Sequence, residues 1–222
     1  MAEVRDAPTR TRVAGLYALT PDREESNALL VRVAAAIAGG ASAIQFRSKS
    51  APPEVKREQA ARLRALCATC GAIFIVNDDV ELARAVAADG VHLGRDDASV
   101  AAARARLPAS AIVGASCYDS LDRAASAVAA GADYIAFGSF HPSATKPDAV
   151  RAQPQLLTVA RARWSIPVVA IGGITAANAP PLIAAGADAL AVLGGVFDAT
   201  DVEAAAREIC ACFRLTRARA RP

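Results

Sequence analysis

The chain has 222 residues, 54% of them hydrophobic, and a formal net charge of +3 at pH 7. This length suits one large α/β domain or two small ones, and the apolar fraction is enough for a substantial core. No apolar run approaches the roughly 18 residues that a membrane span needs, and the first residues do not resemble a secretory signal, so we expect a soluble, cytoplasmic protein.

Short apolar strands and helical segments alternate along the chain. We expect strands at 13–19, 43–46, 73–76, 91–93, 111–115, 134–137, 167–171 and 189–193. We expect helices at 26–38, 53–70, 80–87, 98–106, 120–130, 155–162, 178–185 and 202–215. This order predicts a single (β/α)8 TIM barrel at 13–213, with an N-terminal extension at 1–12 and a basic tail at 214–222. A doubly wound open sheet is the alternative, but it should carry a glycine-rich nucleotide turn after the first strand, and Leu19-Thr-Pro-Asp22 has none.

A glycine precedes every second strand. Gly40, Gly90, Gly131 and Gly186 recur at this point, and Ala-Gly-Ala-Asp occurs before both the sixth and the eighth strand. We expect each glycine to end a helix in the left-handed conformation that glycine adopts without strain.

Basic residues and cysteines give weak signals by themselves. Only Lys49, Lys56 and Lys146 are lysines, and the arginine-rich tail has no interleaved aromatic residues, so a solvated terminus is favoured over a nucleic-acid site. Five cysteines, an odd number, argue against a disulfide framework. Cys67 and Cys70 have a metal-site spacing, but they end a helix rich in Ala and Leu and are interpreted as packing residues.

Acidic residues follow two neighbouring strands. Asn77, Asp78 and Asp79 come directly after the third strand, and Asp96 and Asp97 follow the fourth. The carboxyl ends of parallel strands open on one face, so two such strands can share a hard divalent ion such as Mg²⁺. Each aspartate could instead cap the next helix, which we would prefer for one strand alone. The repetition favours a metal site.

Cations, hydroxyls and glycines follow other strands. Alternation places Gln45, Arg47 and Lys49 on one side of the second strand's end, where a polyphosphate would fit; a solvated loop is the alternative. The loop after the sixth strand contains two hydroxyls and a lysine, typical of anion binding: Ser143, Thr145 and Lys146. Ser116 ends the fifth strand, as a hydroxyl at the barrel mouth or as a helix cap.

Paired glycines follow the last two strands, at 172–173 and 194–195. Glycines here let backbone N–H groups approach a phosphate closely, although tight turns would also explain them. Together with the acids and cations, they predict two phosphorylated substrates, one of which carries a pyrophosphate leaving group.

Five segments in the right order resemble the signature of the thiamine phosphate synthase family, over about 13–213. They are Gln45-Phe-Arg-Ser-Lys49, Phe74-Ile-Val-Asn-Asp-Asp79, His92-Leu-Gly-Arg-Asp-Asp97, Pro142-Ser-Ala-Thr-Lys146 and Ala170-Ile-Gly-Gly-Ile174. The resemblance implies that pyrophosphate leaves 4-amino-2-methyl-5-pyrimidinylmethyl pyrophosphate and that the ring nitrogen of a thiazole phosphate replaces it. Such a dissociative reaction needs stabilisation of the departing charge more than a general base.

The resemblance also implies a role for each matching residue. Asp78 and Asp97 would hold Mg²⁺, while the pyrophosphate would be bound by Arg47, Lys49, Asn77 and Lys146, of which the three cations would be catalytic. Gln45 would place the pyrimidine, and Ser116 would contact the pyrimidine or the pyrophosphate. The thiazole phosphate would be held by Ser143, Thr145, Gly173 and the backbone of Leu193 and Gly194. The chain departs from the usual pattern at Ser48, Arg95, His141, Ser143 and Gly194.

Three other functions compete with a synthase. A thiazole tautomerase-like relative would not be expected to keep the acids and cations together, and a sugar-phosphate epimerase would need a proton-shuttling pair that the strand ends lack. A non-catalytic barrel that binds a phosphate ligand stays open. The expected partners are small-molecule substrates, not nucleic acid or a membrane; the sequence specifies no oligomeric state, and a homo-oligomer stays open.

Overall fold

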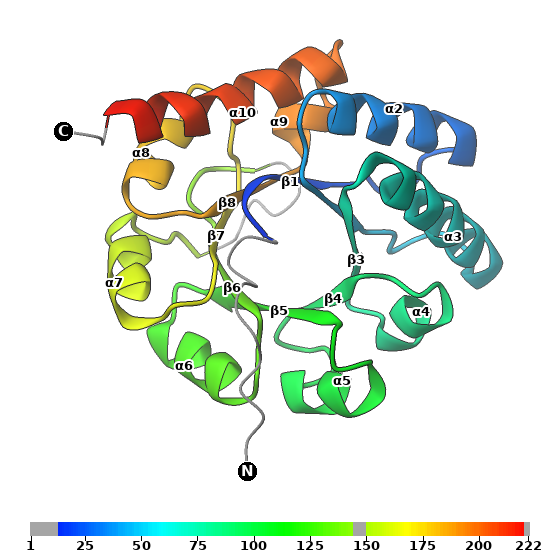
Figure 1. Cartoon of the computed structure of the whole chain (residues 1–222), viewed down its shortest axis with the longest axis horizontal. Helices are drawn as coiled ribbons and strands as arrows, with labels where there is room; N and C mark the ends of the chain where they lie inside the picture. The colour runs from blue at the N-terminus through cyan, green and yellow to red at the C-terminus, as the bar shows by residue number, and fades with distance from the viewer. Residues whose placement is uncertain (1–12, 144–149, 220–222) are drawn as a thin grey trace.

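A computed structural model describes residues 13–143 and 150–219. Eight parallel strands pair in chain order, and β1 also pairs with β8, so the sheet closes into a barrel (Figure 1). The strands are β1 Gly15–Leu19, β2 Ala43–Phe46, β3 Ile73–Asn77, β4 Gly90–Leu93, β5 Ile112–Tyr118, β6 Tyr134–Phe137, β7 Val168–Ile171 and β8 Ala189–Val192. The predicted (β/α)8 barrel is confirmed. The extension predicted at 1–12 lies outside the described residues.

Helices form a ring around the barrel (Figure 1). They are α2 Ser26–Ala38, α3 Pro53–Cys70, α4 Val80–Ala85, α5 Val100–Arg106, α6 Leu121–Ala129, α7 Gln155–Arg163, α8 Ala179–Ala184, α9 Gly194–Phe197 and α10 Val202–Arg219. Two of them differ most from the prediction: α9 was not expected, and α10 continues to Arg219, beyond the expected end at 215. Helices α2 and α3 have the predicted bounds, and the bounds of the others shift by at most two residues. In the described ranges, no helix is both long and apolar enough to cross a membrane.

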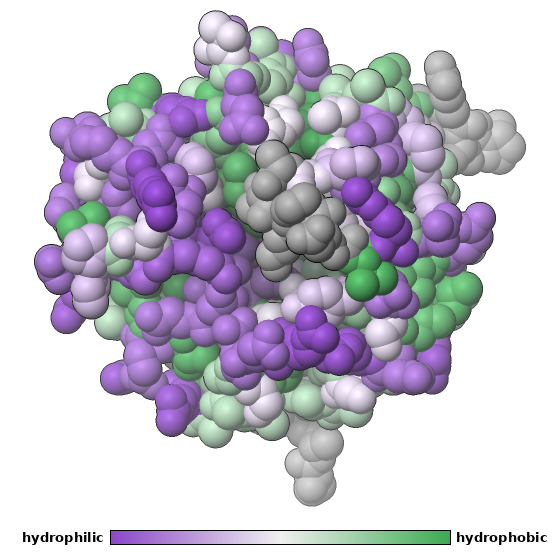
Figure 2. All heavy atoms as spheres, turned by 180° about the vertical axis from the view of Figure 1, so that it is seen from behind, coloured by the Kyte–Doolittle hydropathy of each residue, from purple (hydrophilic) through white to green (hydrophobic). Residues whose placement is uncertain are grey.

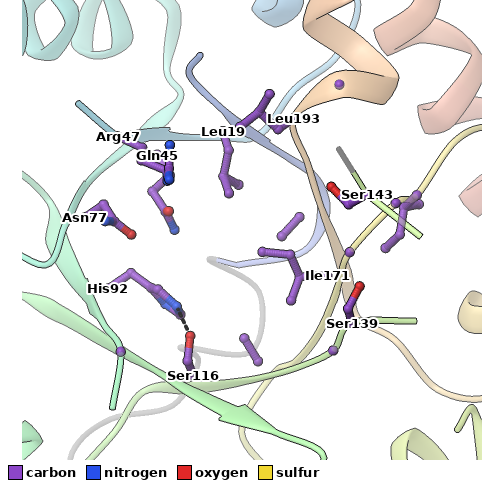
Figure 3. Close-up of a pocket in the computed structure, with 18 of the residues that line it drawn as sticks. Leu19, Gln45, Arg47, Asn77, His92, Ser116, Ser139, Ser143, Ile171 and Leu193 are labelled. Atoms are coloured by element: carbon purple, nitrogen blue, oxygen red, sulfur yellow. Dashed lines mark hydrogen bonds between the residues drawn. The ribbon is translucent and has the colours of Figure 1, made fainter. Parts of the chain in front are cut away.

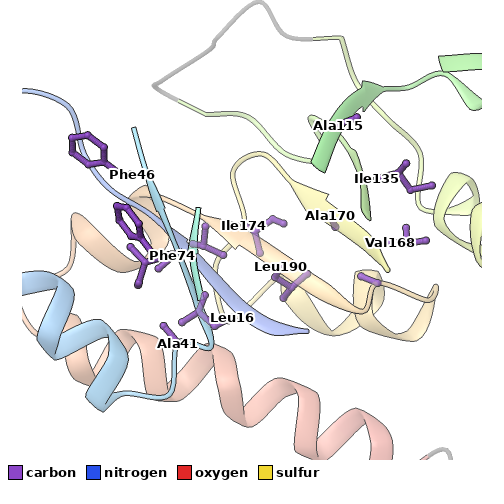
Figure 4. Packing of buried hydrophobic residues seen from close by; sticks show 14 of the residues in the cluster. Leu16, Ala41, Phe46, Phe74, Ala115, Ile135, Val168, Ala170, Ile174 and Leu190 are labelled. Carbon is purple, nitrogen blue, oxygen red and sulfur yellow. The ribbon is translucent and has the colours of Figure 1, made fainter. Parts of the chain in front are cut away.

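The core has two layers because successive side chains of a strand point to opposite faces. The outer layer lies between the strands and the helices, and Figure 4 shows part of it, including Leu16, Phe46, Phe74, Ile135 and Leu190. The inner layer fills the barrel with Tyr17, Ile75, Ile112, Tyr134 and Val169. Burying an aliphatic or aromatic side chain of this size contributes about 1.5–3 kcal/mol. The barrel is therefore packed solid below its mouth.

Three Arg–Asp pairs brace the end of the barrel opposite the mouth. An aspartate before each of three strands accepts a hydrogen bond from the backbone N–H at the start of the preceding strand: Asp89 from Phe74, Asp133 from Val113 and Asp188 from Val168. An arginine from a surrounding helix pairs with each aspartate: Arg64 from α3, Arg104 from α5 and Arg161 from α7. The Ala-Gly-Ala-Asp repeat thus ends in a residue that joins two strands and a helix.

The expected left-handed glycines are found at three of the four positions. Gly40, Gly131 and Gly186 have φ of 108°, 92° and 111°. The prediction is wrong for Gly90, which opens β4, where a Cβ would lie 2.1 Å from the Ile112 carbonyl oxygen. Close contact between strands, not a helix end, therefore requires this glycine. Ala87, with φ of 50°, takes the left-handed position after α4.

All five cysteines are free thiols. Cys67 is fully buried in the outer layer and packs as expected, whereas Cys70 is exposed at the end of α3. The interpretation as packing residues therefore holds for only one member of the pair.

Candidate active site

A cavity of about 480 Å³ opens at the carboxyl ends of the strands. Figure 2 shows this face, where hydrophilic side chains gather around a recess. Most residues predicted for the site line the cavity: Gln45, Arg47, Lys49, Asn77, Asp78, Asp97, Ser116, Ser143, Gly173, Leu193 and Gly194. The other two, Thr145 and Lys146, lie outside the described residues.

Two carboxylates meet on one side of the cavity. Asp78 follows β3 and Asp97 lies in the loop after β4, and their side chains interact directly. The pKa of Asp78 is raised to about 6, because burial desolvates the carboxylate and because Asp97 both hydrogen-bonds to it and repels its negative charge. Two acids in contact form a site that favours a proton or a cation between them.

The backbone fixes both acids. Asp78 has a φ of 66°, which is unusual for a residue other than glycine, and its N–H donates to the His92 carbonyl at 2.8 Å. Asp97 accepts a hydrogen bond from the Gly94 N–H at 2.7 Å. Helix capping does not explain either acid, since Asp79 caps α4 and Ser99 caps α5.

The loop after β1 positions two cations beside these acids. The hydroxyl of Thr20 accepts from the Arg47 N–H at 2.9 Å, and the carboxylate of Asp22 accepts from the Lys49 N–H at 3.0 Å. The Lys49 ammonium lies 3.8 Å from a carboxylate oxygen of Asp78. Positive and negative groups therefore lie side by side on this rim, an arrangement that suits a metal-bound polyphosphate.

The opposite side of the cavity is built from the loops after β6, β7 and β8. Gly173 has a φ of 60°, and a Cβ there would lie 2.1 Å from the Pro142 carbonyl oxygen. The glycine turn thus packs directly against the loop that carries Ser143. Helix α9 begins at Gly194, so the first N–H groups of a helix, which lack intrahelical partners, open at this rim.

A buried hydrogen-bond chain crosses the barrel directly below the cavity. Its successive contacts are Gln45 Nε2 to Tyr17 Oη at 2.7 Å, Tyr17 Oη to Tyr134 Oη at 2.9 Å, Tyr134 Oη to His92 Nδ1 at 2.9 Å, and His92 Nε2 to Ser116 Oγ at 2.8 Å. Burial raises the pKa of both tyrosines well above its usual value, so their hydroxyls stay protonated. In Figure 3, Gln45, Asn77, His92 and Ser116 follow one another around the cavity wall.

Comparison with known proteins agrees with this geometry. A family model described as thiamine monophosphate synthase matches residues 16–196. The chain belongs to this family. Thiamine-phosphate synthases from Thiobacillus denitrificans and Chromobacterium violaceum are 56% and 55% identical to it, over 92% and 91% of this chain and 97% of each relative. A solved thiamine phosphate pyrophosphorylase from Pyrococcus furiosus has a TM-score of 0.84 and 36% identity, and the match covers 94% of this chain and 99% of that one.

The thiamine monophosphate synthase family predicted from the sequence is thus confirmed. Three of the chain's departures from the family pattern line the cavity: Arg95, Ser143 and Gly194. The Arg95 guanidinium lies 5.0 Å from the centre of the Tyr118 ring, where it adds a cation to the acid side. Gly194 leaves room for Asp198, whose carboxylate oxygen lies 2.5 Å from where a Cβ would be. An acid therefore takes the space that a serine side chain would need.

Sequence reasoning missed Tyr17, Tyr134 and His92 as parts of this thiamine monophosphate synthase site. Two of them are aromatic residues within apolar strands, a pattern that indicates core packing. The glycine at 114, inside a predicted strand, is the one sequence signal for the position of Tyr134: a Cβ at Gly114 would lie 1.9 Å from the Tyr134 ring, so only glycine leaves room for that ring inside the barrel. Ser116 was expected at a strand end and instead lies within β5, while Ser120 caps α6.

Proposed function

We propose that the chain is a thiamine-phosphate synthase, a transferase that joins 4-amino-2-methyl-5-pyrimidinylmethyl pyrophosphate to a thiazole phosphate and releases pyrophosphate. One observation carries the proposal: a contacting acid pair with cations beside it faces a glycine-lined rim across one cavity, in a chain of this family. The activity is the one for which the relatives are named. We keep the expectation of a cytoplasmic enzyme whose partners are these small molecules.

Asp78 and Asp97 are suited to hold Mg²⁺. Their carboxylates converge although they repel each other, and Mg²⁺ is commonly bound by one or two carboxylates together with water and substrate phosphates. In the described ranges, no third acid, thiol or imidazole completes a larger cluster. Bound Mg²⁺ would supply positive charge to the pyrophosphate.

The leaving pyrophosphate is assigned to the cations and the amide on the same side. Arg47 and Lys49 would neutralise the charge that develops as the bond to the methylene carbon breaks, and Asn77 would donate a hydrogen bond. Lys146, outside the described residues, completes this proposed group. Gln45 would hold the pyrimidine, and the nearby Ser116 would contact it or the pyrophosphate.

The thiazole phosphate is assigned to the opposite rim. Its phosphate would be held by Gly173 and by the backbone of Leu193 and Gly194, because backbone N–H groups in these turns can approach an anion closely. Ser143 would contribute a hydroxyl, as would Thr145 outside the described residues. This arrangement presents the thiazole nitrogen across the cavity from the departing pyrophosphate.

Pyrophosphate release from the purified protein tests the proposal directly. Release should require both substrates and Mg²⁺, and it should stop when either substrate is omitted. Binding of the thiazole phosphate without any release would instead identify a tautomerase-like or non-catalytic relative. The acids and cations on one rim favour the synthase, since neither alternative needs them.

A further inference from the structure

The buried hydrogen-bond chain joins Gln45 and Ser116 through the side chains of Tyr17, Tyr134 and His92. A change of donor and acceptor roles at one of these side chains affects its neighbours. Tyr17 and Tyr134 are 1% and 0% exposed and do not line the cavity, whereas the two end residues, Gln45 and Ser116, do, as does the edge of His92, which is 6% exposed. The Tyr134 ring is held in place by Gly114 below it and by His92, whose ring stacks on it with centroids 5.5 Å apart. Each hydroxyl or ring nitrogen inside the chain therefore has a fixed neighbour.

The chain has a direction because each tyrosine hydroxyl has one proton. The amide nitrogen of Gln45 can only donate, so the Tyr17 hydroxyl accepts there. The buried Tyr17 proton needs an acceptor of its own, and we assign it to the Tyr134 oxygen, 2.9 Å away. Tyr134 then donates to His92 Nδ1, which leaves the proton of the neutral imidazole on Nε2. That Nε2–H donates to Ser116, whose own hydroxyl proton is left to point elsewhere.

The two ends consequently present opposite polarity. With its nitrogen on Tyr17, the amide of Gln45 turns its oxygen, an acceptor, toward the cavity, while Ser116 offers its O–H as a donor. An isolated amide could turn over and an isolated hydroxyl could rotate. In the hydrogen-bond chain, a flip of the Gln45 amide alone would place two acceptors against each other at Tyr17. A rotation of the Ser116 hydroxyl alone would place two protons against each other at His92. Both are costly because the groups are buried.

We infer that Tyr17, Tyr134 and His92 are positioning residues that fix Gln45 as an acceptor and Ser116 as a donor, and so select an aminopyrimidine over its oxo analogue. The exocyclic amino group of the substrate donates to the Gln45 oxygen, and Ser116 donates to a ring nitrogen or a phosphate oxygen. An oxo group in place of the amino group would set two acceptors face to face. The identity of the substrate in this inference rests on the proposed function. The donor and acceptor assignments of Gln45 and Ser116 rest on the buried hydrogen-bond chain.

The first test reads the polarity without any activity. The protein has only two histidines, so ¹⁵N labelling of histidine gives a simple NMR spectrum in which the two tautomers have distinct nitrogen shifts. At pH 8 without ligands, His92 should carry its proton on Nε2. A proton on Nδ1 would mean that every donor and acceptor along the hydrogen-bond chain is reversed, and this result would overturn the inference.

The second test cuts the chain at its centre with Tyr134→Phe, which removes the hydroxyl and keeps the ring over Gly114. The ratio of kcat/KM for the aminopyrimidine pyrophosphate to that for its 4-oxo analogue should fall about tenfold, because each half of the chain can then reverse alone. Tyr118→Phe is the matched control, since Tyr118 lines the cavity outside the chain, and it should leave this ratio unchanged. An unchanged ratio in Tyr134→Phe would overturn the inference.

The two tests also separate this inference from the proposed function. A protein that releases no pyrophosphate but shows the Nε2 tautomer would refute the synthase and leave the polarity standing. Pyrophosphate release together with the Nδ1 tautomer would support the synthase and refute the inferred polarity.

Discussion

At the scale of single residues, Asp78 combines its proposed role in metal binding with a cost to stability. Its pKa of about 6 lies above the usual value near 3.8, so between these values the folded protein binds more protons than the unfolded chain. Stability therefore falls as the pH rises through this window, and the loss is complete above about pH 6. A bound cation would remove the cost, as expected of a carboxylate placed for a ligand.

We therefore predict that Asp78→Asn stabilises the ligand-free protein at pH 8 and inactivates it. Allowing for the partial exposure of this side chain, the gain should be about 1–2 kcal/mol, or a rise in Tm of roughly 2–8 °C. At pH 4 the two proteins should melt at similar temperatures. Asp96→Asn is the control, because that side chain is 92% exposed and should change Tm little at either pH. Equal melting of the Asp78 variant and the wild type at pH 8 would refute this account.

Gly173 offers a second prediction at this scale. Gly173→Ala would place a Cβ against the Pro142 carbonyl and move the loop that carries Ser143, so KM for the thiazole phosphate should rise about tenfold or more while binding of pyrophosphate changes little. Gly71→Ala is the matched control: its φ of 71° imposes a similar backbone strain, but nothing lies within 4 Å of the added Cβ. If the two variants showed equal KM values, backbone strain rather than loop displacement would be the cause.

The sequence predicted the charged part of the site because polar residues at strand ends break an apolar pattern. Asp78, Asp97, Arg47 and Lys49 were found in this way, and all of them line one cavity. The buried hydrogen-bond chain could not be predicted in this way, because its contacts depend on how the strands are aligned across the barrel. Tyr17 and Tyr134, for example, are 117 residues apart in the sequence.

At the scale of elements, the Arg–Asp pairs join helices to the barrel floor. Arg104 is the most completely engaged: it contacts Asp133 and donates to the carbonyls of Gly131 and Ala111 at 2.9 Å and 2.6 Å. Its side chain is only 11% exposed. Removing it would leave a buried carboxylate and two carbonyls without these partners, far from the mouth.

Arg104→Ala should therefore destabilise the protein by about 3–5 kcal/mol and leave kcat/KM unchanged at 20 °C. Chemical denaturation measures the first quantity and pyrophosphate release the second. Arg84→Ala, which removes an exposed arginine paired with Glu81 within one helix, should cost no more than about 0.5 kcal/mol. Similar losses in the two variants would contradict a bracing role for the buried pair.

Element boundaries were predicted where local patterns decide them and missed where packing does. The alternation of strands and helices was visible along the whole chain, so the barrel was predicted correctly. Helix α9 was missed because Gly194 and Gly195 are poor helix formers. Its position follows from packing, since a Cβ at Gly195 would lie 2.2 Å from the Ile174 carbonyl oxygen. A close contact of this kind leaves no local signal in the sequence.

At the scale of the whole molecule, the mouth is electrostatically divided. In the described part of the chain, four carboxylates and three permanent cations line the cavity: Asp78, Asp96, Asp97 and Asp198 against Arg47, Lys49 and Arg95. All of these except Asp198 follow β2, β3 or β4, whereas the glycine-lined rim follows β7 and β8. On the acid side, three carboxylates offset three cations, so a bound Mg²⁺ would supply the net positive charge that attracts a polyanion. The glycine-lined rim offers backbone N–H groups and would not need the metal.

This division predicts that Mg²⁺ controls one ligand and not the other. Removing Mg²⁺ with EDTA should weaken binding of inorganic pyrophosphate at least tenfold, while binding of the thiazole phosphate should stay within about twofold. Isothermal titration calorimetry with each ligand alone measures both, since neither reacts without the other substrate. Asp78→Asn should make pyrophosphate binding insensitive to Mg²⁺ and leave thiazole phosphate binding intact. If both ligands depended equally on Mg²⁺, the metal would act on the whole mouth, and its assignment to Asp78 and Asp97 alone would be wrong.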